Sequence, residues 1–575
     1  MPVGGSSVVQ NGCNANGCAS AIATTLAVEL FSFGSACGVR RWNRVLGKRL
    51  APNAPATGLS GSGTFLFSGA ASKSLVVGRR TQHACHGWGR DYCFGRMDFG
   101  HLSHTGTGRE GSSRKSALFW AMLFLALASL VSLSIPPLRS PDEIDHIRRA
   151  YLLTRGTLIL KTGASDIQGR AVQASGGEID TGLDNFLMYH LGQLGKPDAG
   201  LAHTKESGVN QLRWSGQAAF RPAPGTSYYF PLLYAPQAAA LVIGEQLKLT
   251  INDSYNLARA FAIFACFALL GVAFLLHPVS LGALALLSLP MAMFQMASAS
   301  LDGVSNALAV VCIAMFLRIH SKPTLTSRGQ FGLWCFGLWA LISCRPHLFP
   351  MLGLPFIVYF HTRKRSQLAS GICTLLATLA WFWMAVGATS DPRAQLGQST
   401  SALVQTYVGH PGEFFVLLWQ TLDSADNLKF YWQSFIGILG WLELPLPNWT
   451  YSFISATGVV LVLVASWAKP APAVCKAQWS LTAVACASVL LVFFALLVTW
   501  TPHPATMISG VQGRYFFVPA LMLAYAWQHP RHELGFWQQR ISGLGLWSFI
   551  AFNSVVLTST LQQRYPSTWA AGLLR

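Results

Sequence analysis

Charged residues are scarce in this chain: Asp, Glu, Lys and Arg make up 11% of its 575 residues, and the mean hydropathy is +0.39. Soluble globular domains carry about 25% charged residues, so the composition excludes an ordinary soluble enzyme. The 22 Asp and Glu are outnumbered by 41 Lys and Arg, which gives a formal net charge of +19. A nucleic-acid binder would carry that excess on a soluble module. Long apolar runs fill most of this chain instead, so we expect no nucleic-acid partner.

The chain also lacks the motifs of nucleotide chemistry and of zinc proteases. It has no Walker motif, no other glycine-rich phosphate loop and no zinc-protease motif, so nothing in it indicates the use of ATP or of nucleotide sugars on the cytoplasmic side. It shows no self-similarity of the kind found in transporters built from inverted repeats. Aromatic residues are abundant at 12%, which excludes a disordered chain. These features together predict a polytopic membrane protein.

Residues 1–115 differ in composition from the rest. They hold 19 of the 53 glycines, and their 13 Lys and Arg against 4 Asp and Glu contribute +9 of the net charge. No apolar period is sustained there, and the Cys and His residues match no strong zinc-ligand spacing. We expect residues 1–115 to be a disordered extension without a catalytic role, or a stretch that precedes the true start of translation.

Apolar segments dominate the remainder. A transmembrane helix needs about 20 mostly apolar residues, and twelve segments reach or approach that length. They cover residues 116–135, 229–247, 260–276, 281–298, 303–319, 332–344, 348–360, 368–387, 451–467, 481–500, 515–527 and 541–560.

The basic residues between these segments predict the topology. Short loops rich in Lys and Arg mark the cytoplasmic side, which places the N-terminus inside and residues 136–228 and 388–450 outside. All the basic loops fall on the cytoplasmic side only if residues 281–298, interrupted by Pro290, do not make a full crossing but form a re-entrant or tilted piece. The fold class predicted is therefore all-α: a polytopic helix bundle of about eleven transmembrane helices plus a re-entrant segment, with two large extracytoplasmic loops.

An acidic motif follows the first span. Ser140, Pro141 and Glu143 have the spacing of an N-cap, a first-turn proline and the third residue of a capping box, so a purely structural interpretation is available. The functional interpretation rests on helical spacing. One face presents acid, imidazole and guanidinium together, while other residues of the helix turn toward the membrane. The polar face comprises Asp142, Asp145, His146 and Arg149, and the apolar one Ile144, Ile147 and Tyr151.

Asp142 is the best candidate for a general base on this face. A carboxylate at a low-dielectric boundary has a raised pKa and can accept a proton from an attacking hydroxyl. Glu143 is partly explained as a cap. Arg149 on the same face could hold a phosphate.

Four further residues or groups stand out among apolar surroundings. Asp302 opens a span, and its structural interpretation is an N-cap or first-turn acid of a helix; its functional interpretation, a second outer carboxylate, is what the resemblance described below implies. Arg514 follows two glycines and suits a phosphate, with interfacial snorkelling as the alternative. Arg345 forms a similar pair with its neighbour His347. Trp441 and Glu443 could bind a sugar, although a tryptophan at the membrane interface is common.

The carboxylate pair just outside the first span resembles the signature of the GT-C class of polyprenyl-phosphate-dependent glycosyltransferases. More closely, five segments look like a family of uncharacterised bacterial predicted membrane proteins related to that class. These segments are Ser140–Tyr151, Tyr229–Tyr234, Leu289–Gly303, Gly440–Pro447 and Gly510–Phe516, the last of which includes Gln512. Glu443 departs from the aspartate that the resemblance leads us to expect.

The resemblance implies a GT-C-like transmembrane domain over residues 116–575 in the cytoplasmic (inner) membrane of a bacterium. Asp142 would deprotonate an acceptor, Glu143 would orient it or bind a divalent metal ion, and Arg514 with Arg149 would hold the lipid phosphate. Substrate contacts would fall to the other candidates: Asp145, His146, Asp302, Arg345, Trp441, Glu443 and Gln512. The partners implied are a lipid-linked sugar donor, a glycan or lipid acceptor of the cell envelope, and membrane lipids.

The function expected from the sequence is therefore transfer of a sugar from a polyprenyl-phosphate donor to an acceptor at the outer face of the membrane. Two alternatives use similar substrates: a transporter or flippase of lipid-linked glycans, and a glycan polymerase or ligase. A transporter or flippase would need the outer carboxylates for binding alone. A polymerase or ligase typically relies on Arg and His in later outer loops.

Overall fold

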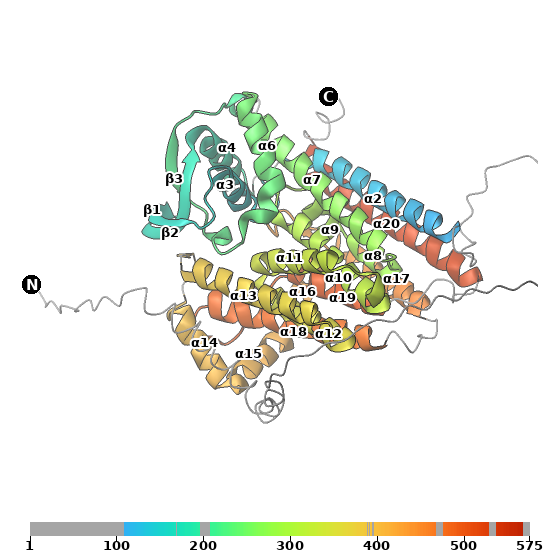
Figure 1. Cartoon of the computed structure of the whole chain (residues 1–575). Helices are drawn as coiled ribbons and strands as arrows, with labels where there is room; N and C mark the ends of the chain where they lie inside the picture. Colours follow the sequence, from blue (N-terminus) through green and yellow to red (C-terminus); the bar gives the residue numbers. More distant parts are fainter. Residues whose placement is uncertain are drawn as a thin grey trace, which may run out of the picture. The chain divides into compact units, whose positions relative to one another are not determined.

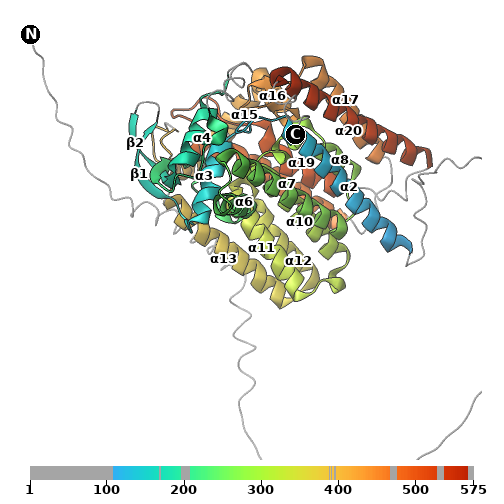
Figure 2. The same ribbon diagram turned by 90° about the horizontal axis from the view of Figure 1, so that it is seen from above.

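The computed structural model describes most of the chain after residue 107. The described residues are 108–167, 170–195, 208–387, 389, 391–393, 396–466, 475–527 and 536–566. The extension expected at residues 1–115 lies almost entirely outside them. Most of the described residues are helical, and Figures 1 and 2 show the long helices running side by side.

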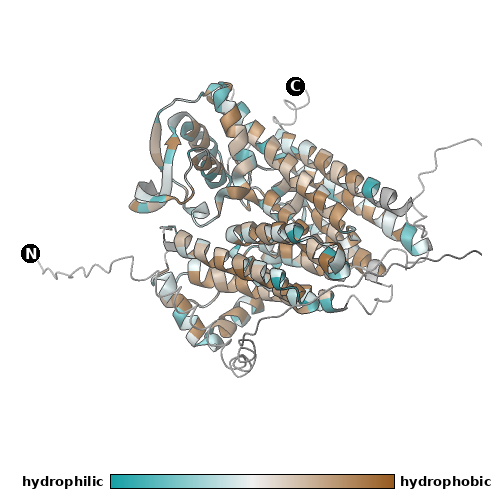
Figure 3. Cartoon of the chain, viewed as in Figure 1, coloured by the Kyte–Doolittle hydropathy of each residue, from teal (hydrophilic) through white to brown (hydrophobic). Residues whose placement is uncertain are grey.

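Six of the described helices are long and apolar enough to cross a membrane. Hydrophobic residues predominate along them, while hydrophilic residues gather around the small sheet and at helix ends (Figure 3). This makes the chain a multi-pass membrane protein. The six are α2 (Gly108–Leu133), α7 (Ile251–Leu276), α10 (Leu301–Ser321), α13 (Arg365–Gly387), α18 (Cys475–Thr499) and α20 (Phe536–Arg564).

The other apolar segments form shorter helices, several of which begin at a proline. Pro290, for example, divides residues 281–298 into two short helices, because proline at the first helical position cannot donate to the preceding turn. The count of about eleven crossings thus stays a prediction. The shorter elements are η4 (Pro231–Tyr234), α6 (Ala235–Gln246), α8 (Leu281–Leu287), α9 (Pro290–Met296), η5 (Pro323–Leu325), α11 (Arg328–Cys344), η6 (Pro346–Leu352), α12 (Gly353–Thr362), α17 (Asn448–Ser466), η8 (Gly513–Phe516) and α19 (Phe517–Ala526).

The first large loop contains a small sheet, so the all-α prediction is wrong in this region. Its strands pair antiparallel in the order β1-β2-β3. Gly176 and Gly177 interrupt the apolar alternation of β2, which hid the strand in the sequence. A Cβ at Gly176 would collide with the backbone carbonyl of Arg221, and a Cβ at Gly177 would press on the side chain of Leu152. The loop comprises α3 (Glu143–Thr154), β1 (Lys161–Ile167), β2 (Arg170–Asp180), α4 (Thr181–Leu191), η2 (Val209–Gln211), β3 (Ala218–Pro222) and η3 (Pro224–Thr226).

The second large loop is mostly helical and lies at the same end of the bundle as the first (Figure 1). Trp381, near the end of α13, donates to the carbonyl of Tyr228 at 3.1 Å. Arg393 lies 3.5 Å from Asp145 of the first loop. We call this end of the bundle the loop end. The elements of the second loop are α14 (Thr400–Gly409), α15 (Pro411–Asp423), α16 (Ala425–Ile436), β4 (Ile438–Leu439) and β5 (Leu444–Pro445).

A separate apolar core joins the first loop to the bundle. Ile144, Ile147 and Tyr151 are buried in it, together with residues of α4, α6 and α7. The expectation that these three residues turn toward the membrane is therefore wrong. They face protein because α3 packs on α6 and on η4. The apolar stripe of α3 identified a buried face correctly, but not what covers it.

Glu143 anchors the start of α3. Its side chain is fully buried, and its carboxylate accepts hydrogen bonds from the amides of Ser140 (3.1 Å) and Ala299 (2.8 Å) and from the hydroxyl of Tyr255 (2.8 Å). Of the expected capping box, only the hydrogen bond from the Ser140 amide to the Glu143 carboxylate forms. The other half does not, because α3 begins at Glu143 and Asp142 is its N-cap. One carboxylate therefore ties the first loop to α7 and to the segment that precedes α10.

We expect Glu143→Gln to lower the stability of the folded protein, although glutamine has nearly the same size and shape as glutamate. The glutamine amide would place a donor against the Ser140 amide, so one charge-assisted hydrogen bond is lost and a donor is left unsatisfied, at a cost of about 2–3 kcal/mol. The thermal midpoint of the purified protein in detergent should fall clearly below that of the wild type. Glu178→Gln, an exposed change on β2, is the control and should leave the midpoint unchanged. An equal midpoint for both variants would contradict the anchoring role.

Candidate functional site

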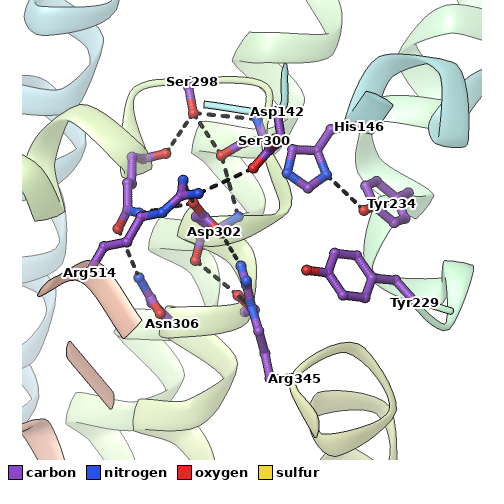
Figure 4. A network of polar contacts seen from close by, with 12 residues as sticks. Asp142, His146, Tyr229, Tyr234, Ser298, Ser300, Asp302, Asn306, Arg345 and Arg514 are labelled. Atoms are coloured by element: carbon purple, nitrogen blue, oxygen red, sulfur yellow. Dashed lines mark hydrogen bonds and ion pairs between the residues drawn. The ribbon is translucent and has the colours of Figure 1, made fainter. Parts of the chain in front are cut away.

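Four charged side chains from four separate segments meet near the loop end (Figure 4). Arg514 of η8 lies 3.2 Å from Asp142 and 3.4 Å from Asp302, and Arg345 also pairs with Asp302. Asp142 precedes α3, Asp302 is in the first turn of α10, and Arg345 directly follows α11. We call these four residues the ion cluster. Its formal charges sum to zero.

Asp142 occupies the exposed side of the ion cluster. Its side chain is 42% exposed, against 7% for Arg514 and 7% for Asp302. Its backbone is left-handed, with φ 57° and ψ 10°. Asp and Asn are the residues other than glycine that tolerate this conformation best. Strained backbone of this kind is characteristic of functional sites, and here it turns the carboxylate away from the helix and toward Arg514.

Asp302 is the buried centre of the cluster. Ser300 is the N-cap of α10, so Asp302 is a first-turn acid, as one of the two interpretations expected. Its carboxylate also accepts from the side-chain amide of Gln295 at 2.9 Å. Two guanidinium groups and one amide thus satisfy a charge that would otherwise be costly at this depth.

The two arginines are held in place by polar groups on neighbouring helices. Arg345 donates to the hydroxyl of Ser305 at 3.1 Å, and the amide next to Arg514, that of Gly513, donates to Ser434 of α16 at 2.8 Å. Arginine is not deprotonated in proteins, and each of these two side chains pairs with a carboxylate. Both guanidinium groups are therefore charged.

His146 lies beside the ion cluster as a neutral imidazole. Its Nδ1 is 2.8 Å from the hydroxyl of Tyr234, and its ring is stacked at 15° to that of Tyr229 (Figure 4). Burial lowers its pKa to about 4, although Asp302 and Asp142 oppose the shift. At neutral pH it is a hydrogen-bonding group rather than a cation.

The cavity within the cluster is small. It has a volume of about 20 Å³ and is lined by Gln295, Asp302, Asn306, Arg345, His347, Arg514, Tyr515 and Val518. Such a space accommodates about one water molecule. Among the described residues, Nε of Arg514 and Oε1 of the neighbouring Gln512 have no hydrogen-bond partner. A ligand larger than water therefore meets the cluster first at the exposed carboxylate of Asp142.

Several residues expected at the site lie elsewhere. Arg149 is fully buried, and its guanidinium donates to the carbonyls of Leu158 (2.5 Å) and Tyr229 (3.1 Å). Helical spacing placed Arg149 on the same face of the helix as Asp142. That spacing could not show that backbone carbonyls bind the guanidinium group. The indole of Trp441 donates to the Leu138 carbonyl at 3.1 Å, and Glu443 is exposed in the hairpin that β4 and β5 form. None of these three side chains lines the cavity.

Sequence reasoning missed Tyr234, Gln295 and Asn306. Gln295 and Asn306 are polar residues in apolar runs, seven residues before and four after Asp302, and this is the signal that could have revealed them. Asn306 donates to Gln295 at 3.5 Å, so the two extend the polar network around Asp302.

The residues present do not fit the divalent metal ion that the resemblance allows. In the part of the chain that the structure describes, no three His, Cys, Asp or Glu side chains are grouped so as to hold a metal ion. Both carboxylates of the ion cluster bear arginine partners, which compete with a cation for the same oxygens.

Asp145 faces the second loop rather than the ion cluster. It accepts from the amide of Gly225 at 3.2 Å and lies near Arg393. Burial raises the pKa of Asp145 from 3.8 to about 6, although Arg393 and Arg148 oppose the shift. Because this pKa is higher in the folded state, the stability that the protonated group contributes is present at low pH and is lost as the pH rises through about 6.

We expect Asp145→Asn to remove this pH dependence. As the pH is lowered from 7.5 to 5, the thermal midpoint of the wild type should rise relative to that of Asp145→Asn. Asp423→Asn, which changes an exposed carboxylate of α15, provides the control. A difference between wild type and Asp145→Asn that does not vary with pH would show that Asp145 has an ordinary pKa.

Comparison with known proteins identifies the family. The model of the family described as "Predicted membrane protein (DUF2142)" matches residues 123–524, a range that contains the whole ion cluster. No curated protein and no solved structure matches the chain. The family expected from the five segments is thereby confirmed, while the likeness to the GT-C class stays an expectation. The chain belongs to the DUF2142 family of predicted membrane proteins.

Proposed function

We propose that this protein is an integral membrane glycosyltransferase that moves a sugar from a polyprenyl-phosphate donor to an acceptor. The ion cluster carries the proposal: an exposed carboxylate, Asp142, is paired with Arg514, which belongs to a buried pair of arginines. A carboxylate beside two fixed guanidinium groups supplies a base and a phosphate site within one network.

The arginines suit the phosphate of the donor. A guanidinium group binds phosphate through a fork of donors, and two such groups at one place give both charge and direction. Arg345 and Arg514 already converge on the Asp302 carboxylate, and Nε of Arg514 has no partner among the described residues. Asp302 therefore holds the two cations together at a depth where either alone would be costly.

Asp142 is the base in this reaction. Its carboxylate takes the proton from an acceptor hydroxyl as that oxygen attacks the anomeric carbon of the sugar. The bond from this carbon to the phosphate oxygen breaks, and the polyprenyl phosphate leaves with the bonding electrons, its charge balanced by Arg514 and Arg345. Direct attack inverts the anomeric centre. His146, neutral and fixed by Tyr234, is placed to hydrogen-bond the sugar or the acceptor.

The depth of the ion cluster agrees with a lipid-linked substrate. Arg259 of α7 donates to the carbonyls of Ser132 and Ile135, where α2 ends. Cys266, seven residues further along α7, contacts the Gly303 carbonyl at the start of α10. Seven residues of helix span about 10 Å, so the start of α10, which carries Asp302, lies about that far along α7 from the end of the first span. This is a depth that a lipid phosphate reaches more readily than a soluble substrate does.

The loop end is assigned to the outer face of the membrane by charge. Arg318, Lys322, Arg328 and Lys364 lie at or beyond the opposite ends of α10, α11 and α12, and basic residues in short loops mark the cytoplasmic side. We therefore place the donor and the acceptor on the extracytoplasmic side of the bacterial cytoplasmic membrane.

Asp142→Asn tests the proposal. Asparagine keeps the left-handed backbone and the size of the side chain but removes the base. We expect purified wild type to transfer label from at least one radiolabelled polyprenyl-phosphate sugar, and the rate to fall about 100-fold or more in Asp142→Asn, as for loss of a general base. Glu178→Gln should retain the wild-type rate.

Two results would refute this function. One is transfer by Asp142→Asn at the wild-type rate. The other is the absence of labelled product with every donor tried, accompanied by measurable movement of lipid-linked sugar across a vesicle membrane, which would identify a transporter. His503 follows α18 in a later segment of the loop end, 3.1 Å from the hydroxyl of Tyr407. Loss of activity in His503→Gln while Asp142→Asn stays active would favour the polymerase or ligase alternative, which relies on His and Arg in such segments.

A further inference from the structure

Helices α15 and α16 expose large apolar side chains although the sequence predicts that the second large loop lies outside the membrane. Trp419 of α15 is 72% exposed, and Phe415, Leu428 and Trp432 are exposed as well. These side chains point away from the apolar core on the other side of α15, where Phe414, Leu417 and Leu418 are buried. The two helices thus have an apolar surface that nothing in the described chain covers.

The exposed side of α15 is divided into an apolar and a polar part. At 100° per residue, Phe415, Trp419 and Leu422 lie within about 60° of one another, while Gln420 and Glu413 lie about 100° and 120° from Trp419. Exposed Val416 and Asp423 lie between these two groups and mark the border. The helix therefore presents one arc to protein, one to an apolar medium and one to water, which is the arrangement of a helix lying in a membrane interface.

The apolar arc continues onto surfaces that face lipid. Trp432 of α16 donates to the hydroxyl of Ser455 on α17 at 2.8 Å. Trp432 also packs against Tyr451 of α17, and on another side of α17 the exposed Phe453 packs against Phe552 of the transmembrane helix α20. Leu428 and Trp432 are one turn apart on the exposed side of α16, and Asp426 and Lys429 lie on its other exposed edge.

The packing of α15 against α18 indicates how deep α15 lies in the membrane. Exposed tryptophans mark both ends of α18, Trp479 at the start and Trp500 just after the end. They are 21 residues apart, about 31 Å along a helix, which equals the thickness of the hydrocarbon layer of a bilayer. Phe414 packs edge-on against Phe494 at a centroid distance of 5.6 Å. This contact is six residues, or about 9 Å, on the membrane side of Trp500.

The geometry points to α15 and α16 as an interfacial hairpin whose occupant is the lipid leaflet at the loop end. Interfacial helices bury their apolar face about 5–10 Å into the boundary between headgroups and acyl chains, and the depth of Phe414 agrees with this. The continuity of the apolar arc with α17 and α20 and the depth of the contact between Phe414 and Phe494 favour lipid over a protein groove as the occupant. The hairpin also braces the ion cluster, because Ser434 of α16 accepts from the amide of Gly513 next to Arg514.

The inference is tested with a fluorescent amino acid at position 419 or 420 of the full chain in lipid nanodiscs. Trp419 and Gln420 are adjacent and both exposed, so either replacement leaves the packing intact, but they lie on different arcs. We expect the probe at 419 to be quenched several-fold more by nitroxide-labelled lipid than by iodide in water, and the probe at 420 to show the reverse. The pair Phe415 and Glu413 repeats the comparison, and unchanged thermal midpoints confirm the fold.

Two outcomes would overturn it. Equal quenching of the two probes by iodide would place both arcs in water. Protection of the probe at 419 from both quenchers would show that protein covers the apolar arc. Neither outcome depends on transfer activity, so the interfacial hairpin and the proposed function fail independently.

Discussion

The arrangement of the site depends on the burial of one carboxylate, that of Glu143. A buried carboxylate is tolerated only when donors surround it, and the three available donors belong to the segment before α3, to α7 and to the segment before α10. Satisfying Glu143 therefore brings the first loop and the start of α10 together. Asp142 directly precedes Glu143, and Asp302 follows Ala299 by three residues. The contacts of Glu143 therefore bring these two aspartates near one another.

The same constraint explains the composition of the ion cluster. Charges placed about 10 Å below the end of a membrane span are stable only when they are paired, and Asp302 pairs with both Arg345 and Arg514. Asp142 differs because its side chain is partly in solvent and its backbone is strained. Under the proposed function, the fixed, buried part of the cluster receives the phosphate and the exposed acid acts on the acceptor. The interfacial hairpin of α15 and α16 would fix the position of the arginine-bearing turn through the hydrogen bond between Ser434 and Gly513.

Much of this was accessible from the sequence, for identifiable reasons. Apolar runs predicted a multi-pass membrane protein, the break at Pro290 was visible, and isolated charges in apolar surroundings singled out Asp302, Arg345 and Arg514. Local spacing was a poorer guide to partners. It grouped Arg149 with Asp142, whereas the carbonyls of Leu158 and Tyr229 bind Arg149. The sheet was missed because β2 contains glycines in a closely packed region. The exposed apolar arc of α15 was missed because the second loop was assigned from the charges around it and not from the helical period within it.

The most direct test of the central claim is a structure of the protein in a lipid bilayer with a polyprenyl phosphate bound. The account predicts phosphate oxygens within hydrogen-bond distance of Arg514 and Arg345, with the Asp142 carboxylate facing the open side of the phosphate. A phosphate bound away from both arginines, or one reached by the arginines while Asp142 points elsewhere, would contradict it.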